Sequence, residues 1–224
     1  MYFRRTLFNF KILFLSLLAF CTNKNCAVSQ DLALGLFEAH GDIGNSEIKG
    51  NVHYNSTSQE YIIEASGENM WFGYDEFHFL WRQVKGDFIL RAQVEFIGEG
   101  VDAHRKLGWM IRENLEPDSP HINACVHGDG LTSLQFRKTT GGDTEEIQSE
   151  MIAPEIIQLE RKGNIYIMST AHFENRDFDT VEYEINMGNE VYVGLYVCSH
   201  NKEVTEKAIF RDVRITFPGD KKYK

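Results

Sequence analysis

The feature that most limits the possible folds of this chain is a succession of short runs in which apolar and polar residues alternate. The runs are rich in Val, Ile, Phe, Tyr and Thr, and Gly, Asn and Asp turns separate them. A period of two is typical of half-buried β-strands, and no stretch sustains a helical apolar stripe over three turns. We therefore predict strands over 61–65, 76–83, 87–97, 106–113, 122–127, 131–138, 156–161, 164–171, 180–185, 190–198 and 208–217.

This number of strands predicts an all-β protein, namely a two-sheet antiparallel β-sandwich or jelly roll. Alternation also assigns the strand faces, because successive side chains point to opposite sides of a sheet. The apolar sides expected to meet in a shared core are Phe88, Leu90, Ala92, Val94 and Phe96; Val191, Val193, Leu195 and Val197; and Phe77, Phe79 and Trp81. Burial of these side chains is expected to be the main stabilising term.

Residues 1–29 have the pattern of a signal peptide. A basic start precedes an apolar run over 12–20, which fits the roughly 7–15 residues of a signal-peptide core and is shorter than the roughly 20 residues that span a bilayer. Small residues at 27–29 favour cleavage before Gln30. We therefore expect an exported protein whose residues 30–224, about 195 in number, form one β-sandwich domain.

A periplasmic and an extracellular location both stay open, and lipid attachment at Cys21 is less favoured, because Phe20 is bulky where a lipoprotein signal has Gly or Ala. Cys125 and Cys198 lie in predicted strands, and the sequence leaves open whether they form a disulfide or two buried thiols. No cofactor is predicted. Asp42 and Asp212 are weak candidates for a Ca²⁺ site, because no dense Asp/Asn loop surrounds them.

The charge of the chain restricts its partners. Loss of residues 1–29 removes four positive charges and no negative ones, which lowers the formal net charge from −10 to −14. Nucleic acid is a poor partner for such a protein because its phosphates need clustered Lys and Arg, and no later segment is apolar enough for a membrane span. Neutral or cationic ligands fit this charge better, although solubility alone explains it equally well. The oligomeric state stays open.

One side of three predicted strands gathers imidazole, amide and guanidinium groups. Consecutive strands are usually neighbours in a sheet, so we expect these groups to share one surface. Those expected on this surface are Arg112, His121, Asn123, His127, Gln135 and Arg137, with His78 at its border and Trp71 beside it.

Several segments resemble a family of bacterial secreted domains with the concanavalin A-like lectin/glucanase fold, of the uncharacterised "regulation of enolase" type. The resemblance covers nearly all of 30–224 and implies a jelly roll with a convex and a concave sheet, and a carbohydrate site on the concave one. Its segments are GDIG (41–44), ASGENMWFGYDEFHFLWRQVKGDFILRAQV (65–94), LGWMIRENLEPDSPH (107–121), GLTSLQFR (130–137) and AIFRDVRIT (208–216).

Carbohydrate binding is the first functional hypothesis, because planar polar side chains match paired hydroxyl groups and aromatic rings stack on sugar faces. In this hypothesis the hydrogen bonds come from Arg112, Asn123, Gln135 and Arg137; the border is formed by His78, His121 and His127; and Trp71 stacks. The alternative for each residue is that these groups satisfy one another, or pair with Glu76 and Glu113, on a solvated sheet.

A glycoside hydrolase or related carbohydrate-active enzyme is the second hypothesis. It needs two carboxyl groups about 5–5.5 Å or 6.5–9.5 Å apart. The Glu-x-Asp-x-Glu pattern of glucanases is absent, which leaves Glu182 with Glu184, or a split pair such as Glu76 and Glu95. The third hypothesis is a structural or partner-binding module, which would carry an exposed apolar patch.

Overall fold

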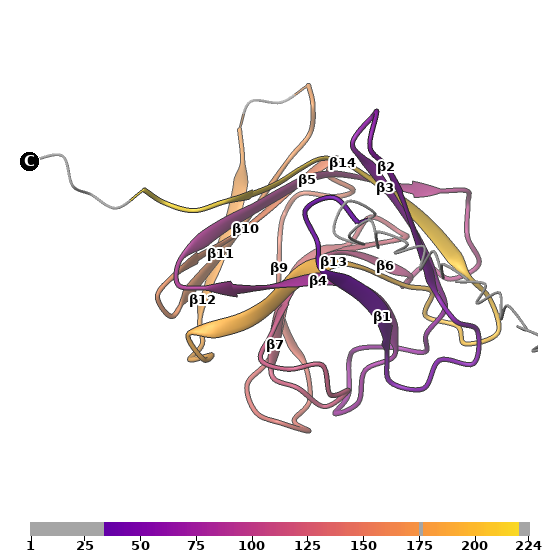
Figure 1. Cartoon of the computed structure of the whole chain (residues 1–224), viewed down its shortest axis with the longest axis horizontal. Helices are drawn as coiled ribbons and strands as arrows, with labels where there is room; N and C mark the ends of the chain where they lie inside the picture. The colour runs from indigo at the N-terminus through magenta and orange to yellow at the C-terminus, as the bar shows by residue number, and fades with distance from the viewer. Residues whose placement is uncertain (1–33, 175–176, 220–224) are drawn as a thin grey trace, which may run out of the picture.

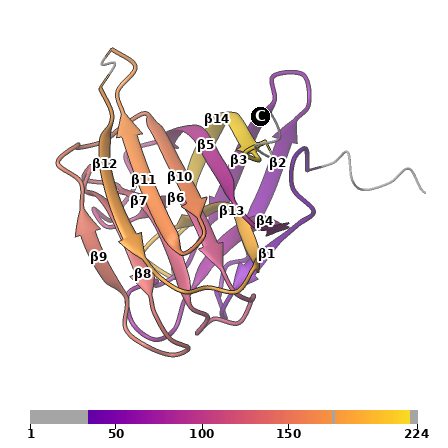
Figure 2. The same cartoon turned by 90° about the vertical axis from the view of Figure 1, so that its left-hand side faces the viewer.

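The computed structural model describes residues 34–174 and 177–219 of the chain. Within these residues, fourteen strands form two antiparallel seven-stranded sheets that lie one over the other (Figures 1 and 2), which confirms the predicted two-sheet sandwich. The described part of the chain contains no helix long and apolar enough to cross a membrane. The expected signal peptide over 1–29 and the alternative lipid site at Cys21 lie outside the described residues.

Each sheet has its own strand order. The sheet that we call the front sheet runs β1 (Ala39–Ile43), β4 (Phe77–Lys85), β13 (Glu190–Cys198), β6 (Lys106–Arg112), β7 (His121–His127), β8 (Thr132–Arg137) and β9 (Glu145–Gln148). The back sheet runs β12 (Asp179–Glu184), β11 (Ile165–Ala171), β10 (Ile156–Lys162), β5 (Phe88–Ile97), β14 (Glu206–Thr216), β3 (Glu60–Ala65) and β2 (Asn51–Asn55). All neighbouring strands pair antiparallel.

The sequence pattern did not predict strands β1, β2 and β9, and each of them lies at the edge of a sheet. Edge strands are commonly short and polar, since these properties protect an unpaired edge from further pairing. The sequences AHGDI, NVHYN and EEIQ follow this rule and offer few buried apolar positions. The eleven predicted runs correspond to the remaining strands.

The main core lies between the two sheets. The alternating apolar sides of β5 and β13 are buried there, with Trp109 of β6 fully enclosed among them. Burial of each large apolar side chain contributes about 1.5–3 kcal/mol. The face assignments for β5 and β13 are therefore confirmed.

The assignment of β4 was wrong in one respect. Leu80 and Val84 of this strand belong to the main core, whereas Phe77 and Phe79 lie in a second apolar cluster with Met110, and Trp81 packs against that second cluster. Met110 is on the outer face of β6, so this second cluster covers part of the outer face of the front sheet, over β1, β4, β13 and β6. Strand β4 is apolar on both faces, and period-two alternation alone does not say which face meets the main core.

Candidate functional site

The polar groups expected on one surface do come from adjacent strands. Strands β6, β7 and β8 are neighbours in the front sheet, and their register places Arg112, His121 and Arg137 side by side in one row. Asn123 and Gln135 form the next row along the same outer face. The structure divides this face into a closed ionic cluster at one end and an open pocket at the other.

The ionic cluster is centred on Asp75, which lies in the segment before β4. Its carboxylate contacts Arg137 Nη2 at 2.6 Å, Arg112 Nη1 at 3.3 Å and His121 Nδ1 at 3.6 Å. All four side chains are 0% exposed. Alternation along the sequence placed Arg112, His121 and Arg137 correctly on one face but did not indicate Asp75 as their partner.

The two arginines also hold the loops that cover this end of the sheet. Arg137 donates to the carbonyl oxygens of Gly142 (2.7 Å) and Ser119 (3.2 Å), and to that of Phe72. Arg112 donates through Nε to the carbonyl oxygen of Asn114 (2.8 Å). These bonds occupy the guanidinium groups that the sequence analysis assigned to a ligand, so in the structure both arginines connect the sheet to its loops.

Burial and charge act in opposite directions in this cluster. Burial would raise the pKa of the Asp75 carboxyl, but His121, Arg137 and Arg112 outweigh it and hold that pKa below its ordinary value. Burial lowers the pKa of His121, against the attraction of Asp75, and lowers the pKa of Arg112 to about 10. At neutral pH the cluster therefore holds a carboxylate, two charged guanidinium groups and a neutral imidazole.

Two further residues of the predicted set are also enclosed. Asn123 is buried and accepts a hydrogen bond from the Tyr196 hydroxyl through Oδ1 at 2.9 Å. His78 is in register with Val197, a residue of the main core, so its side chain is on the opposite face of the front sheet from the polar row. There it contacts Asp42 at 2.6 Å and His40 at 2.9 Å, and burial lowers its pKa.

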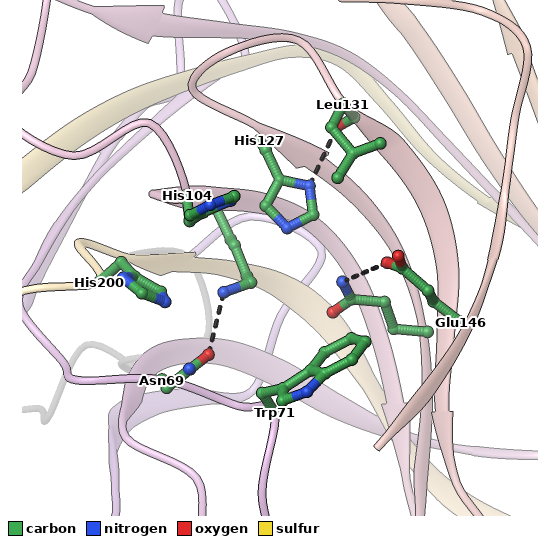
Figure 3. Close-up of a pocket in the computed structure, with 9 residues that line it drawn as sticks. Asn69, Trp71, His104, His127, Leu131, Glu146 and His200 are labelled. Carbon is green, nitrogen blue, oxygen red and sulfur yellow. Dashed lines mark hydrogen bonds between the residues drawn. The ribbon is translucent and has the colours of Figure 1, made fainter.

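The open pocket lies at the other end of β6, β7 and β8 and encloses about 270 Å³. Three members of the predicted set line it, namely Trp71, His127 and Gln135. The other lining residues are Asn69, His104, Lys106, Leu131, Glu146 and His200. Figure 3 shows Trp71 and His127 on facing walls, with Asn69, His104 and His200 on one side and Glu146 on the opposite side.

Hydrogen bonds fix the orientation of His127. Its Nδ1 lies 3.0 Å from the carbonyl oxygen of Leu131, which can only accept, so Nδ1 carries the proton. The other ring nitrogen, Nε2, then presents a lone pair to the interior of the pocket (Figure 3). Burial and the nearby Lys106 ammonium lower the pKa of His127, which keeps the ring neutral at neutral pH.

The two sides of the pocket differ in charge. On one side Lys106 Nζ donates to Asn69 Oδ1 at 3.0 Å. On the other, Glu146 accepts from Gln135 Nε2 at 3.3 Å and from Gln148 Nε2 at 2.8 Å. The pocket therefore presents a cation at one side and a carboxylate at the other, with the Trp71 ring between them (Figure 3).

Some pocket residues carried a sequence signal and others carried none. Lys106 is on the same face of its strand as Arg112, so the alternation that selected Arg112 also pointed to Lys106. Glu146 is on the unrecognised edge strand β9. His104 and His200 come from loops, and only the fold brings them together, with ring centroids 5.5 Å apart.

The alternative carboxylate and metal candidates do not converge. Glu182 and Glu184 are exposed on β12 of the back sheet, while Glu76 precedes a front-sheet strand and Glu95 is on the back sheet. Glu146 is the acid among the pocket-lining residues. Among the described residues no group of three or more His, Cys, Asp or Glu side chains is arranged to hold a metal ion.

The two calcium candidates lie on different sheets, and the two cysteines are not joined by a disulfide. Asp42 is on the front sheet beside His78, whereas Asp212 is on the back sheet and pairs with Arg214 at 2.6 Å. Cys125 and Cys198 are two buried free thiols. Burial raises the pKa of Cys125 to about 12 and that of Cys198 to about 11, so both stay protonated.

Comparison with known proteins gives structural matches. No family model and no curated protein sequence matches this chain. A functionally unknown protein from Saccharomyces cerevisiae matches over 80% of this chain and 97% of its own, with 14% identity and a TM-score of 0.60.

Two further solved structures have TM-scores of 0.51. One is an alginate lyase from Klebsiella pneumoniae, at 12% identity over 75% of this chain and 84% of its own. The other is lectin II from Ulex europaeus, at 6% identity over 80% of this chain and 98% of its own. At such identities the likeness shows the fold alone: the chain has the concanavalin A-like jelly-roll fold.

Proposed function

We propose that this protein binds a carbohydrate in the pocket at the His127 end of the front sheet. The observation that carries the proposal is the Trp71 ring, which faces His127 across a hollow of about 270 Å³ with polar side chains at both sides. Sugars combine apolar C–H faces with paired hydroxyl groups, so a stacking ring flanked by amide and carboxylate groups is the arrangement that they need. The fold adds support, since lectins and alginate lyases share it.

The residues that would contact the ligand are a revised set. Trp71 would stack on a sugar ring, Gln135 and Glu146 would bond its hydroxyl groups, and His127 Nε2 would accept a further hydrogen bond. Arg137 and Arg112 would act indirectly, because Arg137 donates to the carbonyl oxygen of Phe72, next to Trp71, and Arg112 pairs with Asp75 of the same segment. The hollow is slightly smaller than the roughly 300–1,000 Å³ of typical ligand pockets, so we expect it to hold one part of a longer glycan.

A related carbohydrate-active enzyme is the second candidate, and His127 is the observation that favours it. A neutral imidazole with its lone pair in a pocket can accept a proton from a substrate. Hydrolysis by paired carboxyl groups has less support, because the pocket lining contributes Glu146 and no second acid. Incubation with polysaccharides tests this candidate: shorter oligosaccharides in the product would assign catalysis, and unchanged chain length would assign binding.

Export and a closer family assignment are also proposals. We infer export from the pattern of residues 1–29, and the resemblance to the "regulation of enolase" type from the motif order along 41–216.

A partner-binding module without a small ligand is the third candidate, which the exposed Phe72 and Tyr74 beside the pocket favour. A glycan screen separates it from the first, because a pure partner-binding module would retain no glycan.

Substitution of Trp71 tests the proposed function directly. We expect Trp71→Ala to weaken binding of a retained glycan about 30-fold, or about 2 kcal/mol, as for other aromatic anchors. Isothermal titration of the glycan selected on an array measures the change. The matched control is Phe173→Ala, which removes an exposed aromatic ring from the turn after β11. Equal affinity of Trp71→Ala and the unsubstituted protein would exclude this pocket.

A further inference from the structure

The Lys106 ammonium is a buried cation without an anionic partner. Lys106 is 3% exposed, and its Nζ has one hydrogen bond, to Asn69 Oδ1 at 3.0 Å. An ammonium group has three donors, so two of them have no acceptor among the described residues, and Lys106 lines the pocket. Among the residues that the structure describes, no Asp or Glu oxygen lies within 4.0 Å of Lys106 Nζ.

Three other buried cations among the described residues have an anionic partner: Arg105 pairs with Glu206 at 2.6 Å, and Arg112 and Arg137 share Asp75. Arg161 has no ion pair in this part of the chain, but it donates to the carbonyl oxygens of Gly163, Met187 and Gly188. Removal of a charge from water is costly unless the charge is paired, so an uncompensated ammonium in a pocket wall is a functional candidate.

The neighbours of Lys106 suit an anion. Asn69 Oδ1 accepts from both Lys106 Nζ and the Met70 backbone N–H, which fixes the amide orientation and leaves Nδ2 as a further donor. His104 and His200 line the same side of the pocket. The nearby carboxylate of Asp102 accepts a hydrogen bond from the His104 backbone N–H at 2.7 Å and lies 3.4 Å from His200 Nδ1.

The opposite side of the pocket excludes a second anion. Glu146 is there, and its carboxylate accepts hydrogen bonds and repels negative groups. A ligand that spans the pocket would therefore place an acidic group near Lys106 and hydroxyl groups near Glu146. The overall charge of −10 repels anions at long range. Salt screens this repulsion beyond about 8 Å, so at contact distance the attraction of the Lys106 ammonium is the larger interaction.

We propose that the pocket selects sugars that carry a single negative group, with Lys106 and Asn69 as the anion-binding pair. This inference rests on the proposed carbohydrate function and narrows it to acidic glycans. The carboxylate of a uronic acid and a sulfate ester share the required chemistry. Lys106 is then a specificity residue: it adds affinity for the charged sugar and none for its neutral counterpart.

Matched ligands test the proposal. Isothermal titration would compare an oligosaccharide that carries one uronic acid residue with its methyl ester, which keeps the sugars and removes the charge, and with an oligosaccharide of the same length that carries one sulfate ester. We expect the unsubstituted protein to bind one acidic form at least tenfold more tightly than the methyl ester. The tighter acidic form then identifies the source of the negative group.

Matched variants complete the test. Lys106→Met should reduce affinity for the acidic glycan at least tenfold and leave affinity for the methyl ester unchanged. Lys207→Met, which removes an exposed lysine on the back sheet, is the control and should change neither. Lys106→Met should also unfold at a higher temperature than the unsubstituted protein, because it removes an uncompensated buried charge. That measurement needs no ligand and shows that the variant is folded.

The outcomes separate the two proposals. Equal affinity for the acidic glycan and its methyl ester, with Trp71→Ala weakening both, would overturn the acidic specificity and keep carbohydrate binding. Unchanged acidic-glycan affinity in Lys106→Met would also overturn the assignment of Lys106. Failure of every glycan to bind would overturn both proposals.

Discussion

Asp75→Asn is expected to lower the free energy of unfolding by about 3–5 kcal/mol, because it removes the one carboxylate that compensates two buried guanidinium groups. Asn has the size of Asp, so the change acts through charge rather than volume. Denaturant unfolding of both proteins measures the difference. The control is Asp143→Asn, an exposed acid in the loop before β9, which should stay within about 0.5 kcal/mol of the unsubstituted protein.

The same variant has a defined pH signature. The folded-state pKa of Asp75 is lower than its unfolded value of about 3.9, so its stabilising effect is present above that value and is lost as pH falls through the folded pKa. The stability difference between the unsubstituted protein and Asp75→Asn should therefore be constant near neutral pH and decrease below about pH 4. A difference that does not change on acidification would contradict the charged state assigned to Asp75.

Arg137→Met should have a comparable effect, about 3–5 kcal/mol, because it leaves the Asp75 carboxylate and three loop carbonyl oxygens without their main donor. A double-mutant cycle with Asp75→Asn should give a coupling energy of about 1–3 kcal/mol, since the two groups are in contact at 2.6 Å. Lys138→Met, at the next position, is the exposed control.

Measurement of both stability and glycan affinity separates a residue that supports the pocket from one that binds the ligand directly. Arg137 holds the Phe72 carbonyl oxygen, one residue from Trp71, so Arg137→Met should reduce both stability and glycan affinity. Trp71→Ala should reduce affinity and leave stability nearly unchanged, because the ring is on a partly exposed loop. If the stability losses of Arg137→Met and Asp75→Asn were additive, the two side chains would not be coupled. If Arg137→Met lowered glycan affinity without lowering stability, Arg137 would contact the ligand directly and would not be a support of the loop.

Much of the fold could be predicted because half-buried strands carry their own signal. The alternation over β5 and β13 identified both the strands and their buried faces. It failed at β1, β2 and β9, since edge strands bury little and need no apolar side. It also failed to orient β4, whose two faces are both apolar because Phe77 and Phe79 pack under the loops.

The site could be predicted only in part, because alternation gives the face of a residue but not its partner. The polar row on β6, β7 and β8 was expected, and the sheet order confirms that these strands are adjacent. The residues around Asp75 do not indicate that its carboxylate pairs with Arg112 and Arg137. Because of these ion pairs, both arginines are buried and connect the sheet to its loops. His104 and His200 reach the pocket from loops 96 positions apart in the sequence, a distance that no local pattern covers.

The most direct test of carbohydrate binding is an NMR titration that follows the indole N–H signals of the three tryptophans. Trp109 is enclosed in the main core and Trp81 packs on the second cluster, so both serve as internal references. On addition of an acidic oligosaccharide we expect the Trp71 signal to shift in a saturable manner while the other two stay in place. A saturable glycan titration that leaves Trp71 unmoved would contradict the account.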